Sequence, residues 1–152
     1  MKKDILVPFD GSQNAIEALN WAIVLATALD EKITVLNVQP SFHTVHTKMF
    51  FGEQHIREYQ EQLFHAAVAP AEELLKATSV RYSIKLRIGD AKEQICAEAK
   101  GNCEEEHCVN SGSRMIIMGS RGMNPIMGGV LGSVSYGVVN GAPCPVTIVP
   151  HV

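Results

Sequence analysis

Several features that would narrow the function at once are absent from this sequence. No apolar run approaches the roughly 20 residues that a membrane-spanning helix needs, and no segment is rich in Lys and Arg. The formal net charge is −3, and the scattered basic residues form no patch that would attract nucleic acid phosphates. The sequence therefore predicts a protein that binds neither membranes nor nucleic acids.

Secretion and disulfide chemistry are also disfavoured. The opening MKKDILVPFDGS has two lysines, but its apolar stretch breaks at Asp10, so it does not resemble a secretory signal. We therefore expect a cytoplasmic protein. The chain has four cysteines, and in that compartment they are typical of packed thiols rather than of a disulfide framework. Cys96 and Cys103 have helix-face spacing, and Cys144 lies between two prolines, as packed structural thiols would.

What is present is an alternation of strand and helix patterns. Apolar residues make up 46% of the chain, a normal share for a folded protein with a core. We expect strands over residues 5–9, 33–38, 80–88, 115–118 and 145–149, with a helix between each pair. The order βαβαβαβαβ predicts an α/β protein with an open parallel sheet and helices on both faces. No repeat or linker divides residues 1–152, so we expect one domain.

Two of the expected helices carry specific predictions. The long helical pattern over residues 53–77 contains Pro70, which should kink or split the helix. The last helix, over residues 130–139, should turn Val130, Val134 and Val138 inward.

The two edge strands can be recognised by their patterns. Residues 80–88 alternate strictly between apolar and polar, so one face of this strand should meet water. The last strand, Pro145 to Val149, is nearly all apolar, which is a hazard for an exposed edge. Pairing with the same strand of a second copy would remove that hazard, so a homodimer is expected. The alternative, that helices cover this edge, stays open.

Residues 118–133 read MGSRGMNPIMGGVLGS, with five glycines in sixteen residues. The segment follows the fourth strand and leads into the last helix, where backbone N–H groups and the helix dipole favour an anion such as phosphate. A long turn that merely needs glycine is the alternative. The Walker A loop is excluded because its lysine is missing, and the dinucleotide motif G-x-G-x-x-G does not occur.

These residues carry a resemblance to a known family. Gly119, Gly122, Gly132 and Ser133 fit G-x2-G-x9-G-[ST], which resembles the ATP-binding pattern of the universal stress protein family. The resemblance extends over the whole chain through the segments ILVPFDGS, Gly89-Asp90, LGSVS and APCPVTIVP. It implies a Rossmann-like fold of the adenine nucleotide alpha hydrolase type. The implied five-stranded sheet has the order 3-2-1-4-5, and the implied dimer forms through the last strand.

The resemblance also implies a nucleotide site for ATP with Mg²⁺. Asp10 would lie near the ribose and the metal-bound phosphates, with Pro8 shaping the strand end before it, and Val38 would contact adenine through its main chain. Met118 and Gly119 would lie beside the sugar. The implied phosphate cradle consists of Gly122, Gly132, Ser133 and Val134. Two roles stay open: Arg121 either reaches phosphate or is solvated, and Asp10 is alternatively a turn or helix-entry residue.

The resulting expectation is a dimeric ATP-dependent switch or sensor in stress response. Phosphoryl transfer needs a cationic clamp and a positioned base, and Asp10 with Arg121 supports that poorly, so hydrolysis should be slow or absent. A slow ATPase or nucleotidyl-transferring enzyme is the first alternative, although the H-x-G-H and SGGxDS signatures are absent. A nucleotide-free interaction module is the second. The sequence identifies no protein partner.

Two segments depart from the family pattern. Residues 41–52, with His43 and His46, are expected to form a polar loop, a lid or a dimer contact rather than a metal site with His55. Residues 101–113 are longer and more acidic than usual. The zinc interpretation of Cys103, His107 and Cys108 is disfavoured, and the run 104–106 is expected to be a solvated face.

Overall fold

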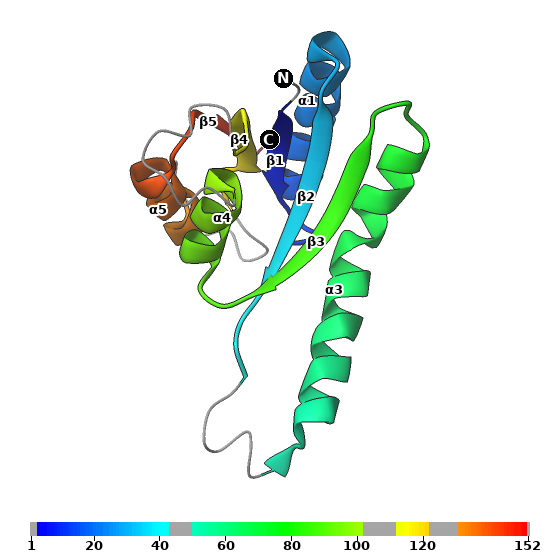
Figure 1. Ribbon diagram of the computed structural model, residues 1–152, viewed down its shortest axis with the longest axis vertical. Helices are drawn as coiled ribbons and strands as arrows, with labels where there is room; N and C mark the ends of the chain where they lie inside the picture. Colours follow the sequence, from blue (N-terminus) through cyan, green and yellow to red (C-terminus); the bar gives the residue numbers. More distant parts are fainter. Residues whose placement is uncertain (1–2, 43–49, 102–111, 122–130, 152) are drawn as a thin grey trace.

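The computed structural model describes residues 3–42, 50–101, 112–121 and 131–151. Strands and helices alternate along these ranges, as the sequence predicts (Figure 1). The strands are β1 (Asp4–Pro8), β2 (Lys32–Gln39), β3 (Tyr82–Ile88), β4 (Met115–Gly119) and β5 (Val146–Val149). The helices are α1 (Gln13–Leu29), α3 (Glu53–Lys76), α4 (Ala91–Lys100) and α5 (Ser133–Gly141).

All five strands form one parallel sheet in the order β3-β2-β1-β4-β5. Val7 pairs with Val35 of β2, and on the other side Leu6 pairs with Ile116 of β4. The expected order and the two expected edge strands are therefore confirmed. Because the chain passes from β1 to β2 on one side and reaches β4 on the other, strand order reverses between β1 and β4.

Helices cover both faces of the sheet, as expected. Side chains alternate along a strand, so Ile5 and Val7 point to one face and Leu6 to the other. Ile5 and Val7 join the core under α1 and α3, whereas Leu6 joins a second core with Ile95 of α4 and Val138 of α5. Within the described ranges no helix is both long and apolar enough to cross a bilayer.

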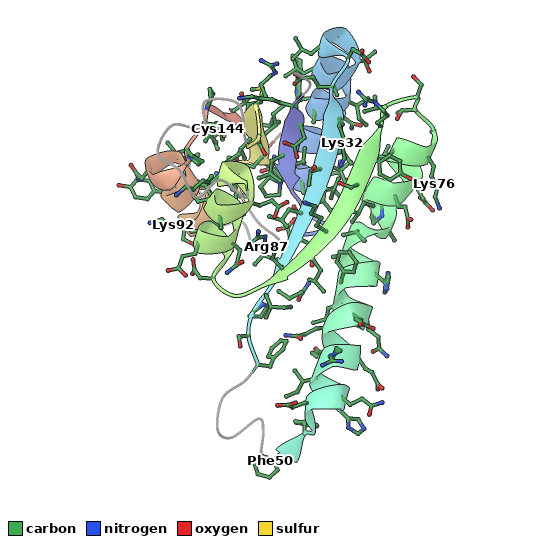
Figure 2. All side chains as sticks on the ribbon, in the orientation of Figure 1. Lys32, Phe50, Lys76, Arg87, Lys92 and Cys144 are labelled. Carbon is green, nitrogen blue, oxygen red and sulfur yellow. The ribbon has the colours of Figure 1, made fainter. Side chains whose placement is uncertain are left out.

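Helix α3 is continuous through Pro70, so the predicted split is wrong. Pro70 removes the N–H that would bond to the carbonyl of Ala66, but Ala66 is exposed and water can satisfy that carbonyl. Figure 1 shows the N-terminal part of α3 extending well past the sheet. Tyr59 in this part is exposed, and Phe50 lies near the same end, 78% exposed (Figure 2).

The polar face of β3 is shielded by α4 rather than left entirely to water. Glu98 of α4 accepts from Lys85 Nζ at 2.6 Å and from Arg87 Nε at 2.7 Å, and Arg87 also donates to Gln94 at 3.1 Å. Burial acts to raise the pKa of Glu98, but the hydrogen bonds from the two cations outweigh it and lower the pKa. The alternation of β3 therefore reflects a charged contact between sheet and helix.

A second ion pair closes the opposite end of the sheet. The buried carboxylate of Glu31, just before β2, accepts from Arg114 Nε at 2.6 Å and from its NH2 group at 2.5 Å. Arg114 immediately precedes β4, so this two-pronged contact links the starts of β2 and β4 across β1. The hydrogen bond from Arg114 is the main reason that the pKa of Glu31 is lowered.

Replacing Glu31 with glutamine is expected to lower the melting temperature at pH 7. Because the folded-state pKa is lowered, the stabilisation is present above the pKa that Glu31 has in the unfolded chain and is lost as pH falls through the folded value. The melting temperatures of the variant and the parent should therefore converge below about pH 4. A difference that stays constant from pH 7 to pH 3 would contradict this prediction.

Candidate functional site

The turn from β1 into α1 is held by its own side chains. Asp10 Oδ1 accepts from the backbone N–H of Ser12 at 2.9 Å, and Ser12 Oγ accepts from Ala15 N at 3.2 Å, which caps α1. Gly11 has φ +85°, and an added Cβ would lie 3.1 Å from the carbonyl oxygen of Ala67 in α3. Asp10 therefore does serve as a turn residue, and that role uses one of its two carboxylate oxygens.

Buried amides fix the end of β1 against the end of β2. Asn37 Nδ2 donates to the carbonyl of Phe9 at 2.8 Å, and Gln39 Nε2 donates to Asn37 Oδ1 at 2.6 Å. The sequence interpretation missed both residues. Their signal was present, however, because polar side chains interrupt an otherwise apolar strand in ITVLNVQ. These amides hold in place the residue immediately before Asp10.

Val38 lies in the part of β2 that extends past the end of β1. The β1–β2 register ends at the pair Pro8 and Leu36, while β2 continues to Gln39. The Leu36 carbonyl accepts from Phe9 N on the β1 side, and the Gln39 carbonyl accepts from Gly89 N on the β3 side. Backbone groups alternate between the two edges of a strand, so the Val38 N–H and C=O face the side on which β1 has ended.

The start of the glycine segment is organised by Asn14, another residue that the sequence interpretation missed. Asn14 Oδ1 accepts from Arg121 N at 3.0 Å and from Ser120 Oγ at 3.4 Å. An added Cβ on Gly119 would lie 2.6 Å from the Asn14 amide, so close packing by Asn14 explains this glycine. Met118, just before it, is buried.

The two described ends of the glycine segment are joined to each other. Gly132 N donates to the Ser120 carbonyl at 2.8 Å, and Ser135 Oγ donates to the carbonyls of Ser120 and Gly132 at 2.9 and 3.0 Å. Gly132 has an ordinary φ of −62° and is the N-cap of α5. Gly122 lies outside the described residues.

The N-terminus of α5 therefore lies beside the end of β4. Ser133 is its first residue, later than the predicted start at residue 130, and the N-cap glycine has no side chain that could occupy the first-turn N–H groups. Val134 is 38% exposed, so the prediction that it points inward is wrong, whereas Val138 is buried as expected. Val130 lies outside the described residues. A helix N-terminus without a capping side chain favours an anion through its N–H groups and its dipole.

These contacts gather most of the predicted site residues at one end of the sheet. Asp10 follows β1, and Val38 lies near the end of β2. Gly119 is the last residue of β4, Arg121 follows it, and Gly132 immediately precedes α5. The ends of β1 and β4 flank the point where strand order reverses, which is where open parallel sheets bind ligands.

The cysteine and histidine predictions are tested only in part. Among the described residues no cluster of three or more His, Cys, Asp or Glu side chains could hold a metal. Cys96 and Cys144 are half-buried free thiols, and burial is the main cause that raises the pKa of each. This agrees with packed thiols. The described residues do not include His43, His46, Cys103, residues 104–106, His107 or Cys108.

Comparison with solved structures supports the fold. The universal stress protein UspA of Lactobacillus plantarum is 25% identical, with a TM-score of 0.75 and 97% of each chain covered. A universal stress protein family protein of Arabidopsis thaliana, with AMP bound, is 21% identical at a TM-score of 0.65, covering 99% of this chain and 92% of that one. A universal stress protein in complex with cAMP is 18% identical at a TM-score of 0.66, with 97% and 96% covered.

Sequence comparison gives the same family. A protein of Staphylococcus haemolyticus named as a universal stress protein is 28% identical over 157 aligned residues, covering 97% of this chain and 84% of that protein. The model of the universal stress protein family matches residues 1–150. The chain therefore belongs to the universal stress protein family.

Proposed function

We propose that this protein binds ATP with Mg²⁺ and acts as a dimeric, nucleotide-dependent switch or sensor in stress response. The observation that carries the proposal is the closure of the glycine segment at its base. The Ser120 carbonyl accepts from both Gly132 N and Ser135 Oγ, which places the uncapped start of α5 beside the end of β4. A phosphate group at that position would meet backbone N–H groups and the positive end of a helix dipole.

The nucleotide would lie across the ends of β2, β1 and β4. Adenine would contact the outward-facing main chain of Val38, and the sugar would lie beside Met118 and Gly119. Asp10, after Pro8, would hold Mg²⁺ with the phosphates through the carboxylate oxygen that the turn does not use. The proposed phosphate cradle consists of Gly122, Gly132, Ser133 and Val134, with Arg121 at its entrance.

The solved relatives favour an adenine nucleotide as the ligand class. One relative is described with AMP bound and another in complex with cAMP. Both molecules share adenosine and one phosphate with ATP, so they support recognition of that part. The preference for ATP rests on this chain's own residues at the start of α5.

Calorimetric titration with Mg-ATP, and with AMP for comparison, tests the proposal. We expect Mg-ATP to bind at least tenfold more tightly than AMP, because one charge-assisted hydrogen bond to an outer phosphate is worth about that factor. Equal affinities for Mg-ATP and AMP would show that the protein recognises the adenosine part rather than the outer phosphates. If neither nucleotide binds, the protein is a nucleotide-free interaction module. Steady ADP release by the parent protein that is lost in the Asp10→Ala variant would identify the protein as an ATPase rather than a switch.

A second copy of the chain is proposed to pair along β5. No strand in the described part of the chain lies beyond β5, and its residues VTIV include no charge, whereas the other edge strand carries Lys85 and Arg87. Charged side chains protect an exposed edge against pairing, so β5 is the unprotected edge.

The helices next to β5 also lack charge on their exposed faces. Helices α1 and α5 both contact β5, and Glu17 is the one charged residue in the two of them. Glu17 lies beside His151 just past β5, and Trp21 and Val24 continue that flank of α1 at helical spacing, both more than half exposed. A surface of this kind suits an apolar contact with a second copy.

Replacing Thr147, an exposed residue of β5, with lysine is expected to convert a dimer into a monomer. Gln62→Lys, an equal charge change on the exposed face of α3, is the matched control and should leave the dimer intact. Sedimentation equilibrium at micromolar concentration distinguishes the two states. A monomeric parent protein, or a dimer that survives Thr147→Lys, would contradict pairing through β5.

A further inference from the structure

Asn14 is a polar residue buried at the junction of three elements. It lies in the first turn of α1, and only 2% of its surface is exposed. A buried amide must have hydrogen-bond partners, because burying it without them would cost more stability than an apolar residue in its place. The hydrogen-bond partners of Asn14 therefore indicate what the residue does.

The two ends of the Asn14 amide bind different parts of the chain. Oδ1 accepts from the N–H of Arg121 and the hydroxyl of Ser120, which are the first residues after β4. Nδ2 donates at 3.1 Å to the carbonyl of Val149, the last residue of β5, and at 3.2 Å to Glu17. The entry of the glycine segment is thus tied to α1 and to the end of β5 through one side chain.

Packing fixes this amide as firmly as the hydrogen bonds do. Gly119 has no side chain, and an added Cβ would lie 2.6 Å from both Cγ and Oδ1 of Asn14. The absence of a Cβ lets the amide sit against the backbone of β4 and reach Arg121 two residues later. Asn14 and Gly119 therefore form one packing unit.

We propose that Asn14 is a positioning residue for the nucleotide, holding Ser120 and Arg121 where the phosphate-binding segment leaves the sheet. The inference rests on the proposed function and deepens it. Asn14 is buried behind the loop entry and acts through the Arg121 N–H and the Ser120 hydroxyl. Because the Ser120 carbonyl also accepts from Gly132 N, the position set by Asn14 is passed on to the start of α5.

The test compares nucleotide affinity with thermal stability in five proteins. These are the parent, Asn14→Ala, Gly119→Ala, the double variant that combines both changes, and the control Asn20→Ala, which changes an exposed asparagine of the same helix. We expect Asn14→Ala to weaken Mg-ATP binding about tenfold, as the loss of one well-placed hydrogen bond would. Amide exchange at Arg121 should be faster in that variant without nucleotide, and the control should match the parent.

The double variant separates positioning from packing. The methyl group that Gly119→Ala adds occupies space that the Asn14 amide vacates, so the double variant should be more stable than the sum of the two single changes predicts. Its affinity for Mg-ATP should nevertheless remain at least about tenfold weaker than that of the parent, because the hydrogen bond to Arg121 is still missing. Affinity that returns together with stability, or Asn14→Ala binding as tightly as the parent, overturns the inference. A parent protein that binds no adenine nucleotide defeats the proposed function itself.

Discussion

Replacing Gly132 with valine is expected to weaken Mg-ATP binding about 100-fold, the cost of two charge-assisted hydrogen bonds to phosphate. Gly132 is the N-cap of α5, and its added Cβ would already lie 3.3 Å from the Ser120 carbonyl. The two further methyl groups of valine would extend into the space in front of the first-turn N–H groups. A phosphate could then no longer approach those groups closely.

The opposite end of the same helix supplies the matched control. An added Cβ on Gly141 would make only ordinary contacts, at 3.5 Å to Lys92 and 3.6 Å to Cys96. Gly141→Val should therefore bind Mg-ATP like the parent protein. Calorimetric titration of both variants decides the matter, with circular dichroism confirming that both are folded. Parent-like affinity in folded Gly132→Val would remove α5 from the proposed phosphate site.

The largest expected loss of stability comes from Gly112→Ala. Gly112 has φ +96°, and an added Cβ would lie 2.6 Å from the carbonyl oxygen of Ala99 and 2.9 Å from that of Lys100. Both atoms belong to the backbone at the end of α4, so neither can rotate away. Strained φ and overpacking together should cost about 3 kcal/mol, which corresponds to a fall in melting temperature of roughly 10 °C.

Gly52→Ala is the control for this prediction. Gly52 is the N-cap of α3 with an ordinary φ of −64°, and an added Cβ would meet only the His55 side chain, at 3.8 Å. Its replacement should cost at most about 1 kcal/mol, as expected for a changed N-cap. Thermal unfolding followed by circular dichroism measures both variants. Equal melting temperatures for the two would show that the segment at Gly112 can move away from α4.

The glycines show how far a sequence pattern can go. The spacing of Gly119, Gly122 and Gly132 predicted a special segment after the fourth strand, and it did so from sequence alone. It could not say that Gly119 is needed because Asn14 packs against it, since the two residues meet only in the folded chain. Gly132 has an ordinary φ, so the need for a glycine at this position also comes from its surroundings rather than from its own backbone conformation.

The partners of the buried amides could not be predicted for the same reason, although the polar positions themselves are visible in the sequence. Asn14, Asn37 and Gln39 lie in segments whose apolar neighbours set the periodicity, and each was treated as part of the pattern rather than as a site. Their roles depend on partners far along the chain, such as the Asn14 contacts to Arg121 and Val149. The predicted split at Pro70 is wrong for a local reason, because α3 continues through it and the carbonyl of the exposed Ala66 can bond to water.

By itself, the sequence determined the α/β class, the parallel sheet, the two edge strands and the family. These follow from local periodicity and from a motif of fixed spacing, both of which are properties of neighbouring residues. Only the tertiary structure decided which side chains hold the loop entry, how α4 shields β3, and that the glycine segment closes on itself at Ser120 and Gly132. Those contacts join residues distant in sequence, and their geometry exists only once the sheet has brought its strand ends together.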